Sequence, residues 1–345
     1  MGLVDHLPRV RLGHFPTPLQ EAPRLGAALG GPRIWIKRDD LSGLSVGGSK
    51  TRIFEFVLGD AAAAGATAVV ASAGEQSNKL RELAAGANRL GMKPILLLTG
   101  VTGPTELAGN RFLFEVLGAD IRTTPIADRF DPALKAELDR LCGEAAAAGH
   151  RPYLVYHPGR TGTLGAAAYV AAAEELTGQL GALGLGPVHV FIATGAAPTT
   201  AGLALGLRAM RLEAAVIGVS VAAPADEAKA QVLAYAERCA DLLGIDHRPS
   251  AADVTIDGSQ RADFSLPATP AVIEAIELFA RTEGVLLEPT YTAKAAAGMI
   301  AAIRRGALGP SDSVVFVHTG GLPGLFAHAG EFGYGIDGGQ ASRRT

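Results

Sequence analysis

The stretch KRDDLSGLSVGGSKTR (residues 37–52) poses the question on which the fold and the chemistry depend. Gly47 and Gly48 precede Lys50, and the residues that follow have the apolar spacing of a buried helix. A lysine at this place can contact a phosphate, act as an ordinary cation at a helix start, or form a covalent imine. Taken alone, a short Gly-Gly-x-Lys stretch favours the ordinary cation. A Walker A loop is excluded, because its Gly-Lys pair and its earlier glycine are missing.

The segments that surround this stretch alternate between short β-branched runs and alanine-rich runs of helical length. This alternation predicts βα units with parallel sheets, and therefore an α/β fold. The clearest helical runs each end in glycine, as a helix C-cap does. The predicted strands are 67–72, 93–100, 153–157, 188–195, 215–222 and 312–320, and the clearest predicted helices are 78–91, 131–149 and 292–306.

Length and composition limit the class of protein. A chain of 345 residues favours two domains around a shared cleft. Hydrophobic residues make up 48% and charged residues 19%, which is enough for a sizeable core and argues against disorder. The net charge is −3 with acids and bases interspersed, so no basic surface for nucleic acid is expected.

Cysteine use and the amino-terminal residues indicate a compartment. Cys142 and Cys239 have no CxxC spacing, which favours reduced thiols. The first 20 residues carry charges and prolines where a signal peptide has a continuous apolar stretch. Glu, Arg and Gly interrupt the alanine-rich runs, so no membrane span is expected. We therefore expect a soluble, cytoplasmic protein with no metal site.

The stretch ASAGEQSNKLREL (71–83) is a strand that leads through a small-residue turn into a helix. Ser77 and Asn78 lie where that helix begins, so backbone N–H groups and short polar side chains converge there. Such a place can bind a carboxylate or a phosphate. Simple N-capping is the commoner use of these residues and is the better interpretation of the stretch alone.

The stretch FIATGAAPTTAGLALGL (191–207) repeats this strand, turn and helix pattern. The N–H groups of its turn can hold a phosphate at the start of the helix. A Rossmann turn fits poorly because the GxGxxG spacing is absent, and Pro198 contributes no N–H. The residues whose N–H groups are candidates are Gly195, Ala196, Ala197 and Thr199.

Two carboxy-terminal stretches, EGVLLEPTYTAKAAAG (283–298) and VFVHTGGLPGLFAH (315–328), also place polar residues at the ends of apolar runs. Tyr291 and Thr292 belong to the first stretch, and His318 and Thr319 to the second. A tyrosine at such a place is more often a packed amphipathic side chain than a catalyst.

The order of these stretches is more specific than any one of them. The chain resembles the 1-aminocyclopropane-1-carboxylate deaminase/D-cysteine desulfhydrase family, whose members use pyridoxal 5'-phosphate on the fold of the tryptophan synthase β subunit. The resemblance implies two domains, each with a mostly parallel twisted sheet flanked by helices, and a homodimer. Residues 1–49 and 163–345 would form the large cofactor-binding domain, and 50–162 the small substrate-side domain. The matching stretches are FPTPL (15–19), 37–52, QSN (76–78), ATG…TTAG (193–202), 283–300 and HTGGLPGLF (318–326).

The resemblance assigns roles to individual residues. Lys50 would hold the cofactor as an imine and then act as the base at the substrate α-carbon, which requires a partly neutral lysine. Asn78 would face the ring hydroxyl, and Ser77 would help to bind the substrate carboxylate. Tyr291 would lie close to the substrate as a proton donor or acceptor. The turn that would hold the phosphate comprises Thr194, Gly195, Ala196, Ala197 and Thr199.

Two threonines indicate which branch of the family the chain resembles. Members that open the cyclopropane ring have a glutamate after the tyrosine and a leucine in the HxGG stretch. This chain has Thr292 and Thr319 there, as the desulfhydrase branch does. A carboxylate would keep the pyridine nitrogen protonated and make the ring a strong electron sink, whereas a hydroxyl only donates to a neutral nitrogen. The weaker sink suits β-elimination better than ring opening.

The chain departs from the family's pattern around the substrate. Phe264 replaces a tyrosine of the family and has no proton to give. Lys79 follows QSN, where histidine or glutamine is usual, and Glu75 is placed to pair with it. Arg160 occupies the turn before the next helix, and Pro198 replaces a glycine of the phosphate turn. Lys79 and Arg160 would favour a substrate with an anionic side chain, unless both are solvated surface charges.

These observations predict a pyridoxal phosphate-dependent lyase that acts on a small β-substituted amino acid. α,β-Elimination and deamination would give pyruvate and ammonia, and the substrate class would be D-cysteine, cysteate or 3-chloroalanine. β-Replacement, in which a second nucleophile is added, shares the first half of the chemistry. A catalytically silent cofactor-binding homologue is the alternative from a different class. No nucleic-acid or membrane partner is expected.

Overall fold

Two separate and mostly parallel sheets organise the chain in the computed structural model, which describes residues 2–104, 106–156, 159–261, 268–337 and 340–343. The larger sheet has six strands in the order β1-β2-β10-β7-β8-β9, and only the edge strand β1 is antiparallel to its neighbour. Its strands are β1 (Leu19–Glu21), β2 (Arg33–Lys37), β7 (Val188–Thr194), β8 (Ala214–Ser220), β9 (Val254–Asp257) and β10 (Ser313–Val317).

The smaller sheet has four strands in the order β5-β4-β3-β6, and all of them are parallel. They are β3 (Ala68–Ala73), β4 (Lys93–Thr99), β5 (Asp120–Thr124) and β6 (Pro152–Val155). The middle strands are buried along most of their length, as expected for parallel strands covered on both faces. All four strands lie within residues 50–162, and the strands of the larger sheet lie outside that range. The domain boundaries themselves remain a prediction.

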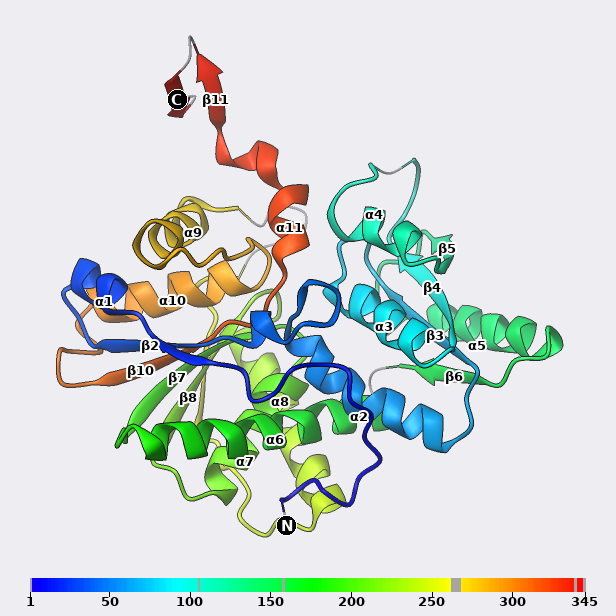
Figure 1. The fold of residues 1–345 in the computed structure, drawn as a ribbon, viewed down its shortest axis with the longest axis horizontal. Helices are drawn as coiled ribbons and strands as arrows, with labels where there is room; N and C mark the ends of the chain where they lie inside the picture. Colours follow the sequence, from blue (N-terminus) through cyan, green and yellow to red (C-terminus); the bar gives the residue numbers. More distant parts are fainter. Residues whose placement is uncertain (1, 105, 157–158, 262–267, 338–339, 344–345) are drawn as a thin grey trace.

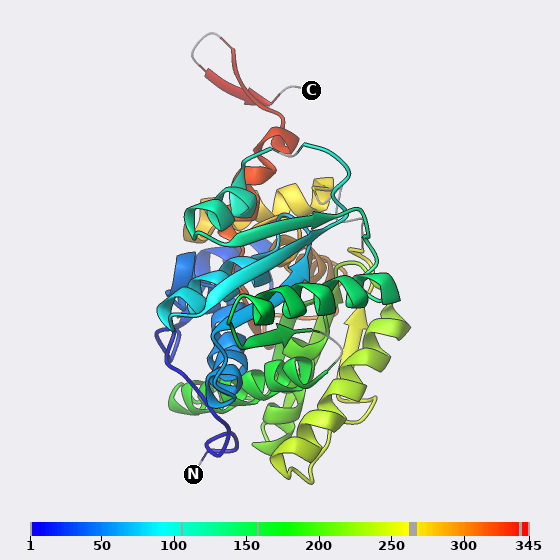
Figure 2. The ribbon, with the colours of Figure 1, turned by 90° about the vertical axis from the view of Figure 1, so that its right-hand side faces the viewer.

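Helices flank both sheets, as Figures 1 and 2 show. In Figure 1, α6 and α7 lie below the larger sheet and α1, α9 and α10 above it, while α3 and α5 accompany the smaller sheet. The helices are α1 (Pro23–Leu29), α2 (Ser49–Ala63), α3 (Asn78–Arg89), α4 (Gly109–Val116), α5 (Pro132–Ala147), α6 (Arg160–Ala182), α7 (Pro198–Ala209), α8 (Ala225–Leu243), α9 (Pro270–Glu283), α10 (Thr292–Arg304) and α11 (Leu322–Ala327). Short 3₁₀ turns lie at Asp39–Leu41, Leu44–Val46 and Ala329–Phe332.

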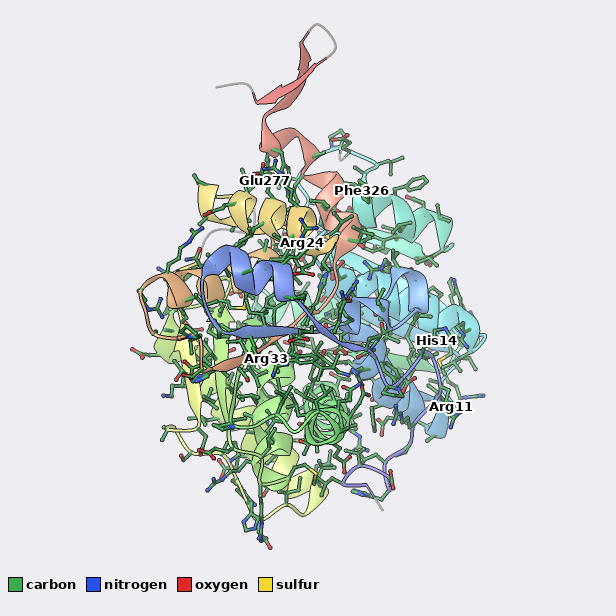
Figure 3. The ribbon with its side chains drawn as sticks, turned by 60° about the vertical axis from the view of Figure 1, so that its left-hand side comes forward. Arg11, His14, Arg24, Arg33, Glu277 and Phe326 are labelled. Atoms are coloured by element: carbon green, nitrogen blue, oxygen red, sulfur yellow. The ribbon has the colours of Figure 1, made fainter. Side chains whose placement is uncertain are left out.

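The carboxy-terminal segment extends away from both sheets. A hairpin of β11 (Tyr334–Asp337) and β12 (Gln340–Arg343) projects beyond α11 in Figures 1 and 2. Phe326 of α11 is 66% exposed and is labelled at the surface in Figure 3, on the side of α11 nearest α4. α11 therefore presents an aromatic side chain to the exterior.

The structure confirms the predicted fold class and all six predicted strands, within one or two residues at most ends. The three predicted helices correspond to α3, α5 and α10, and Gly91, Gly149 and Gly306 after them have the positive φ of a C-cap. Sequence periodicity did not reveal β2 or β5. β2 has only five residues with charge at both ends, and β5 is a polar strand at the sheet edge.

Candidate functional site

Lys50 is the second residue of α2, and two glycines, Gly48 and Gly320, fix the loop from which this helix starts. Gly48 has φ +134, and a Cβ added to it would come within 2.6 Å of Glu82 Oε1 and 3.2 Å of the Thr319 carbonyl oxygen. A Cβ on Gly320 would come within 2.6 Å of Gly48 Cα. The Ser49 N–H donates to that same Thr319 carbonyl at 2.9 Å. The loop after β10 therefore holds the start of α2, and only glycine fits between them.

The surroundings of Lys50 disfavour the protonated form of its amine. Burial lowers the pKa of Lys50, and the attraction of Glu82 opposes this only in part. Its Nζ contacts Ser49 Oγ at 3.3 Å. Burial, together with the positive charges of Lys50 and Arg129, lowers the pKa of Lys79 to about 8. Two amines with lowered proton affinity thus lie close together, and a neutral lysine is what attack on a carbonyl carbon requires.

Ser77 and Asn78 lie at the start of α3, as the sequence predicts. Ser77 is the N-cap, and its Oγ accepts the Leu80 N–H at 3.3 Å, so the capping interpretation holds for this residue. Asn78 follows as the first residue of the helix. A Cβ on Gly321 would come within 3.1 Å of Asn78 Nδ2, which places this amide against the turn after β10. The starts of α2 and α3 therefore meet the same turn.

The turn between β7 and α7 has the geometry of an anion site. Ala197, the N-cap of α7, has φ +59 and ψ −40, an unfavourable conformation for a residue other than glycine. Its side chain offers no acceptor, so it cannot cap the first N–H groups of α7. Those groups are available to a ligand at the positive end of the helix dipole. Thr194 is buried beneath the turn, with its hydroxyl 2.8 Å from that of Thr200.

Tyr291 covers this turn from the start of α10. A Cβ on Gly195 would come within 3.0 Å of Tyr291 Cε1, so the glycine leaves room for the ring. The carboxylate of Glu288 accepts the N–H groups of Tyr291 and Thr292 at 2.7 and 2.8 Å and holds the loop in place. Burial, followed by the nearby charge of Glu288, raises the pKa of Tyr291 to about 12. The phenol therefore stays protonated at neutral pH.

The two threonines occupy different environments. Thr292 is fully buried, and its hydroxyl accepts the Glu288 N–H at 2.9 Å and donates to the Glu288 carbonyl at 3.3 Å. Thr319 is half-buried beside the start of α2. The preceding His318 is neutral, because burial lowers its pKa, and its Nδ1 accepts the Gly320 N–H. The His318 ring therefore fixes the turn after β10.

The structure does not bring Arg160 to this pocket. Its guanidinium pairs with Asp60 at 2.6 Å, and the same carboxylate accepts the Tyr153 hydroxyl at 2.7 Å. Asp60 follows Lys50 by ten residues on α2, which separates them by about 15 Å along the helix. Phe264 lies outside the described residues.

Lys79 and Glu75 do not form the expected pair. The Lys79 ammonium donates to the Ser72 carbonyl oxygen at 2.8 Å, and Glu75 Oε1 is buried with no hydrogen-bond partner among the described residues. Arg129, on the loop after β5, is the cation that the sequence did not single out. It lines a cavity of about 260 Å³ together with Ala196 of the phosphate turn. The other lining residues are Phe130, Gln231, Ala234, Tyr235 and Arg238.

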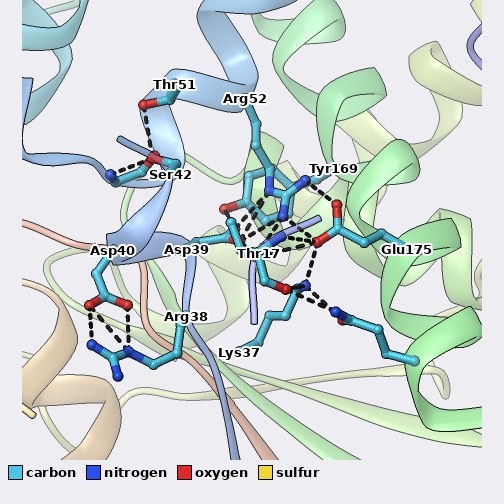
Figure 4. A network of polar contacts seen from close by, with 12 residues as sticks. Thr17, Lys37, Arg38, Asp39, Asp40, Ser42, Thr51, Arg52, Tyr169 and Glu175 are labelled. Atoms are coloured by element: carbon cyan, nitrogen blue, oxygen red, sulfur yellow. Dashed lines mark hydrogen bonds and ion pairs between the residues drawn. The ribbon is translucent and has the colours of Figure 1, made fainter. Parts of the chain in front are cut away.

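The charged residues on either side of Lys50 in the sequence belong to a buried network, shown in Figure 4. Arg52 Nη2 lies 2.8 Å from both Asp39 Oδ1 and Glu175 Oε1. Lys37 also pairs with Glu175, and the Tyr169 hydroxyl donates to Asp39 at 2.7 Å. The network ties β2 and α6 to α2. Most charged side chains of the KRDD…SKTR stretch thus form structural ion pairs, whereas the Lys50 amine contacts the Ser49 hydroxyl instead.

The arrangement fits pyridoxal 5'-phosphate, the cofactor that the resemblance implies. Lys50 provides an amine of lowered pKa, Asn78 a side-chain amide, and the start of α7 an anion site. These groups come from three chain segments that meet at the carboxyl ends of parallel strands, where α/β sheets bind ligands. Within the described ranges, no group of histidine, cysteine and acidic side chains is arranged to bind a metal. In the same ranges, no helix combines the length and apolar character that crossing a membrane requires.

Comparisons with known proteins agree with this assignment. Residues 10–320 match the model of the pyridoxal-phosphate dependent enzyme family. The chain is 34% identical to a 1-aminocyclopropane-1-carboxylate deaminase of Burkholderia ambifaria, over 94% of this chain and 98% of the relative. It is 36% identical to a D-cysteine desulfhydrase of Salmonella typhi, over 94% and 97%.

A solved structure of an ACC deaminase homologue superposes with a TM-score of 0.84 at 30% identity, covering 96% of this chain and 97% of the other. The apo structure of Escherichia coli diaminopropionate ammonia lyase superposes with a TM-score of 0.63 at 15% identity, which is a likeness of fold. The family match covers both sheets, Lys50, Asn78 and the turn between β7 and α7, and we conclude that this chain belongs to the pyridoxal-phosphate dependent enzyme family and uses that cofactor.

Proposed function

We propose that the protein is a lyase that eliminates the β-substituent of a small amino acid and releases pyruvate and ammonia. The observation that carries this proposal is Lys50, a half-buried amine of lowered pKa in the first turn of α2, close enough to Lys79 of α3 for their charges to interact. The relatives named as a D-cysteine desulfhydrase and a 1-aminocyclopropane-1-carboxylate deaminase support the reaction class.

The side chains around the pocket divide the chemical work. When bound, the cofactor supplies an electron sink for the negative charge that develops at the substrate α-carbon. Lys50, once neutral, takes the proton from that carbon. Ser77 and the first N–H groups of α3 bind the substrate carboxylate at the positive end of the helix. Tyr291, whose pKa is raised to about 12, keeps its proton and donates it to the departing substituent.

Thr292 supports elimination over ring opening. Its hydroxyl is engaged by the backbone of Glu288, and the Glu288 carboxylate is occupied by the N–H groups of Thr290, Tyr291 and Thr292. This segment therefore offers no unengaged carboxylate to hold a proton on the pyridine nitrogen. A weaker electron sink suffices when the leaving group carries the charge away.

A panel of amino acids tests the proposed reaction. D-cysteine, L-cysteine, cysteate and 3-chloroalanine are incubated with the holoenzyme, and pyruvate and ammonia are measured. At least one of them is expected to yield both products in equal amounts, whereas 1-aminocyclopropane-1-carboxylate is expected to yield no ketoacid. If no substrate gives either product while the cofactor absorbance still changes on amino-acid addition, β-replacement becomes the better assignment. If the absorbance does not change either, the protein is a silent homologue.

The cations near the pocket favour a substituent with negative charge. Lys79 and Arg129 are close enough for the arginine to lower the pKa of Lys79, and Arg129 acts in the same direction on Tyr291. The cavity beside the phosphate turn adds Arg238, and its described lining contains no carboxylate. An anionic group such as a sulfonate would relieve the repulsion among these cations. Arg129 and Lys79, and not Arg160, therefore support the proposal of an anionic substrate, because Arg160 pairs with Asp60.

Replacing Arg129 tests this preference. Arg129→Gln is expected to lower kcat/KM for cysteate about tenfold, as loss of one charge-assisted contact does, and to change kcat/KM for uncharged 3-chloroalanine less than about twofold. Arg129→Lys should recover most of the loss. Arg122→Gln, which removes a surface arginine paired with Asp120 on β5, is the control and should affect neither substrate. Equal losses for the two substrates would show that Arg129 has no part in recognising the substituent.

We also propose that the protein is a cytoplasmic homodimer. Phe112 and Val116 on α4 are 50% and 65% exposed, and Phe326 on the neighbouring α11 is 66% exposed. Apolar surface of this kind is typical of a protein–protein interface.

A further inference from the structure

The side-chain amide of Asn78 has a defined orientation. Its Oδ1 accepts hydrogen bonds from Arg81 Nη1 at 2.8 Å and from Asn110 Nδ2 at 2.9 Å. A guanidinium can only donate, so the Asn78 atom that faces Arg81 must be the oxygen. The Nδ2 atom is therefore turned the other way, toward Gly321, where a Cβ would come within 3.1 Å of it.

Asn110, the second partner, is itself held in one orientation. Its Oδ1 accepts from Arg81 Nη1 at 2.9 Å, and its Nδ2 donates to the Gln76 carbonyl oxygen at 2.9 Å. The Gln76 side chain accepts the Asn110 N–H at 2.9 Å and donates to the Ala108 carbonyl oxygen at 3.1 Å. Asn110 is fully buried, so rotating its amide would leave polar atoms without partners inside the protein.

Arg81 connects this amide pair to the loop that precedes Lys50. It is fully buried, and its Nη2 donates to the Gly47 carbonyl oxygen at 2.8 Å and to Glu82 Oε1 at 3.0 Å. The Thr51 hydroxyl donates to the other oxygen of Glu82 at 2.6 Å. These bonds and those to Asn78 and Asn110 engage both terminal nitrogens of the guanidinium, whereas its Nε has no hydrogen-bond partner among the described residues. Arg81 thus links Asn78 to residues on both sides of Lys50 in the chain.

We propose that Arg81 and Asn110 are positioning residues, which hold the Asn78 amide so that its Nδ2 donates to the ring hydroxyl oxygen of the cofactor. If the Asn78 amide were reversed, its Oδ1 would face the ring hydroxyl oxygen of the cofactor, and the two oxygens would repel each other. The proposal depends on cofactor binding, which the family match supports, and not on the reaction that follows.

The experiment is a pH titration of the visible absorbance of the cofactor bound to Lys50, without substrate. The group that titrates is the imine nitrogen between Lys50 and the cofactor. A donor to the ring oxygen stabilises the form in which this imine nitrogen is deprotonated, because the ring oxygen then carries its full negative charge. Asn110→Ala and Arg81→Lys are therefore expected to raise the midpoint by about one pH unit, which corresponds to the loss of a hydrogen bond to a charged group. The matched controls Asn88→Ala and Arg89→Lys, near the other end of α3, should leave the midpoint unchanged.

A double variant separates positioning from a general structural effect. Asn78→Ala should raise the midpoint by itself, and adding Asn110→Ala should then produce no further shift, because Asn110 acts through Asn78. An unchanged midpoint in a folded, cofactor-loaded Asn110→Ala protein would overturn the proposal, and so would additive shifts in the double variant. Asn110→Ala alone decides the matter if Arg81→Lys does not fold. Failure of the amino-acid panel with a normal titration would reject the proposed reaction and leave this inference standing.

Discussion

Lys50→Ala is expected to lower the rate of pyruvate release by about 10³-fold or more, because it removes the base and the covalent attachment of the cofactor together. A positioned general base alone contributes about 10²–10⁴ in rate. The fold should persist, since Lys50 is half-buried and, among the described residues, its amine donates a hydrogen bond only to Ser49. The visible absorbance of the lysine-linked cofactor should disappear as well. An unchanged circular dichroism spectrum would show that the protein is still folded and that unfolding is not the cause of the lost activity.

Lys79 supplies the matched control for this experiment. It lies near Lys50, its ammonium is also enclosed, and its pKa is lowered to about 8. Lys79→Met should keep the visible absorbance, because covalent attachment is assigned to Lys50. Its turnover with an uncharged substrate should change far less than that of Lys50→Ala. If Lys79→Met lost the absorbance and Lys50→Ala kept it, the cofactor would be attached to Lys79, and the assignment to Lys50 would be wrong.

The parallel sheets and the turns of the site were accessible from sequence because they depend on local patterns. Strands β3, β7 and β10 are apolar runs that end in small or polar residues, and the turn after each of them reaches the site. The glycines at 47, 48 and 195 were recognisable for the same reason, and the structure shows what each leaves room for.

What sequence could not supply was the direction in which each charged side chain points. Arg129 lies on the loop before α5 and Arg160 is the first residue of α6, and both follow strands of the smaller sheet. Arg160 nevertheless pairs with Asp60, whereas Arg129 lines the cavity beside the phosphate turn. Arg81 gave a signal, because it and Glu82 are adjacent charged residues within the run Leu80–Ala87, whose other members are apolar or glycine. Its partners Asn110 and Gly47 lie 29 and 34 residues away, so only the folded chain identifies them.

The partners of the charged residues beside Lys50 were likewise not predictable from sequence. In the structure they form a buried network, from which a prediction for stability follows. Arg52 is 4% exposed and holds two carboxylates, those of Asp39 and Glu175. Burial would raise the pKa of Asp39, but the charge and hydrogen bonds of Arg52 outweigh it and hold that pKa below its ordinary value. Without the arginine, buried negative charge would remain with little compensation.

Arg52→Met, which keeps much of the volume and removes the charge, is therefore expected to lower the free energy of unfolding by about 3–5 kcal/mol in urea titrations at neutral pH. Arg33→Met, which breaks an exposed pair with Glu21 at the surface labelled in Figure 3, is the control and should cost at most about 1 kcal/mol. Because the Asp39 pKa is lower in the folded state, the stability that its pairing contributes is present above the unfolded pKa of about 3.9 and is lost as the pH falls through the folded value. The difference between the wild type and Arg52→Met should shrink below that pH. A difference no larger than that of Arg33→Met at neutral pH would mean that the buried network does not stabilise the fold.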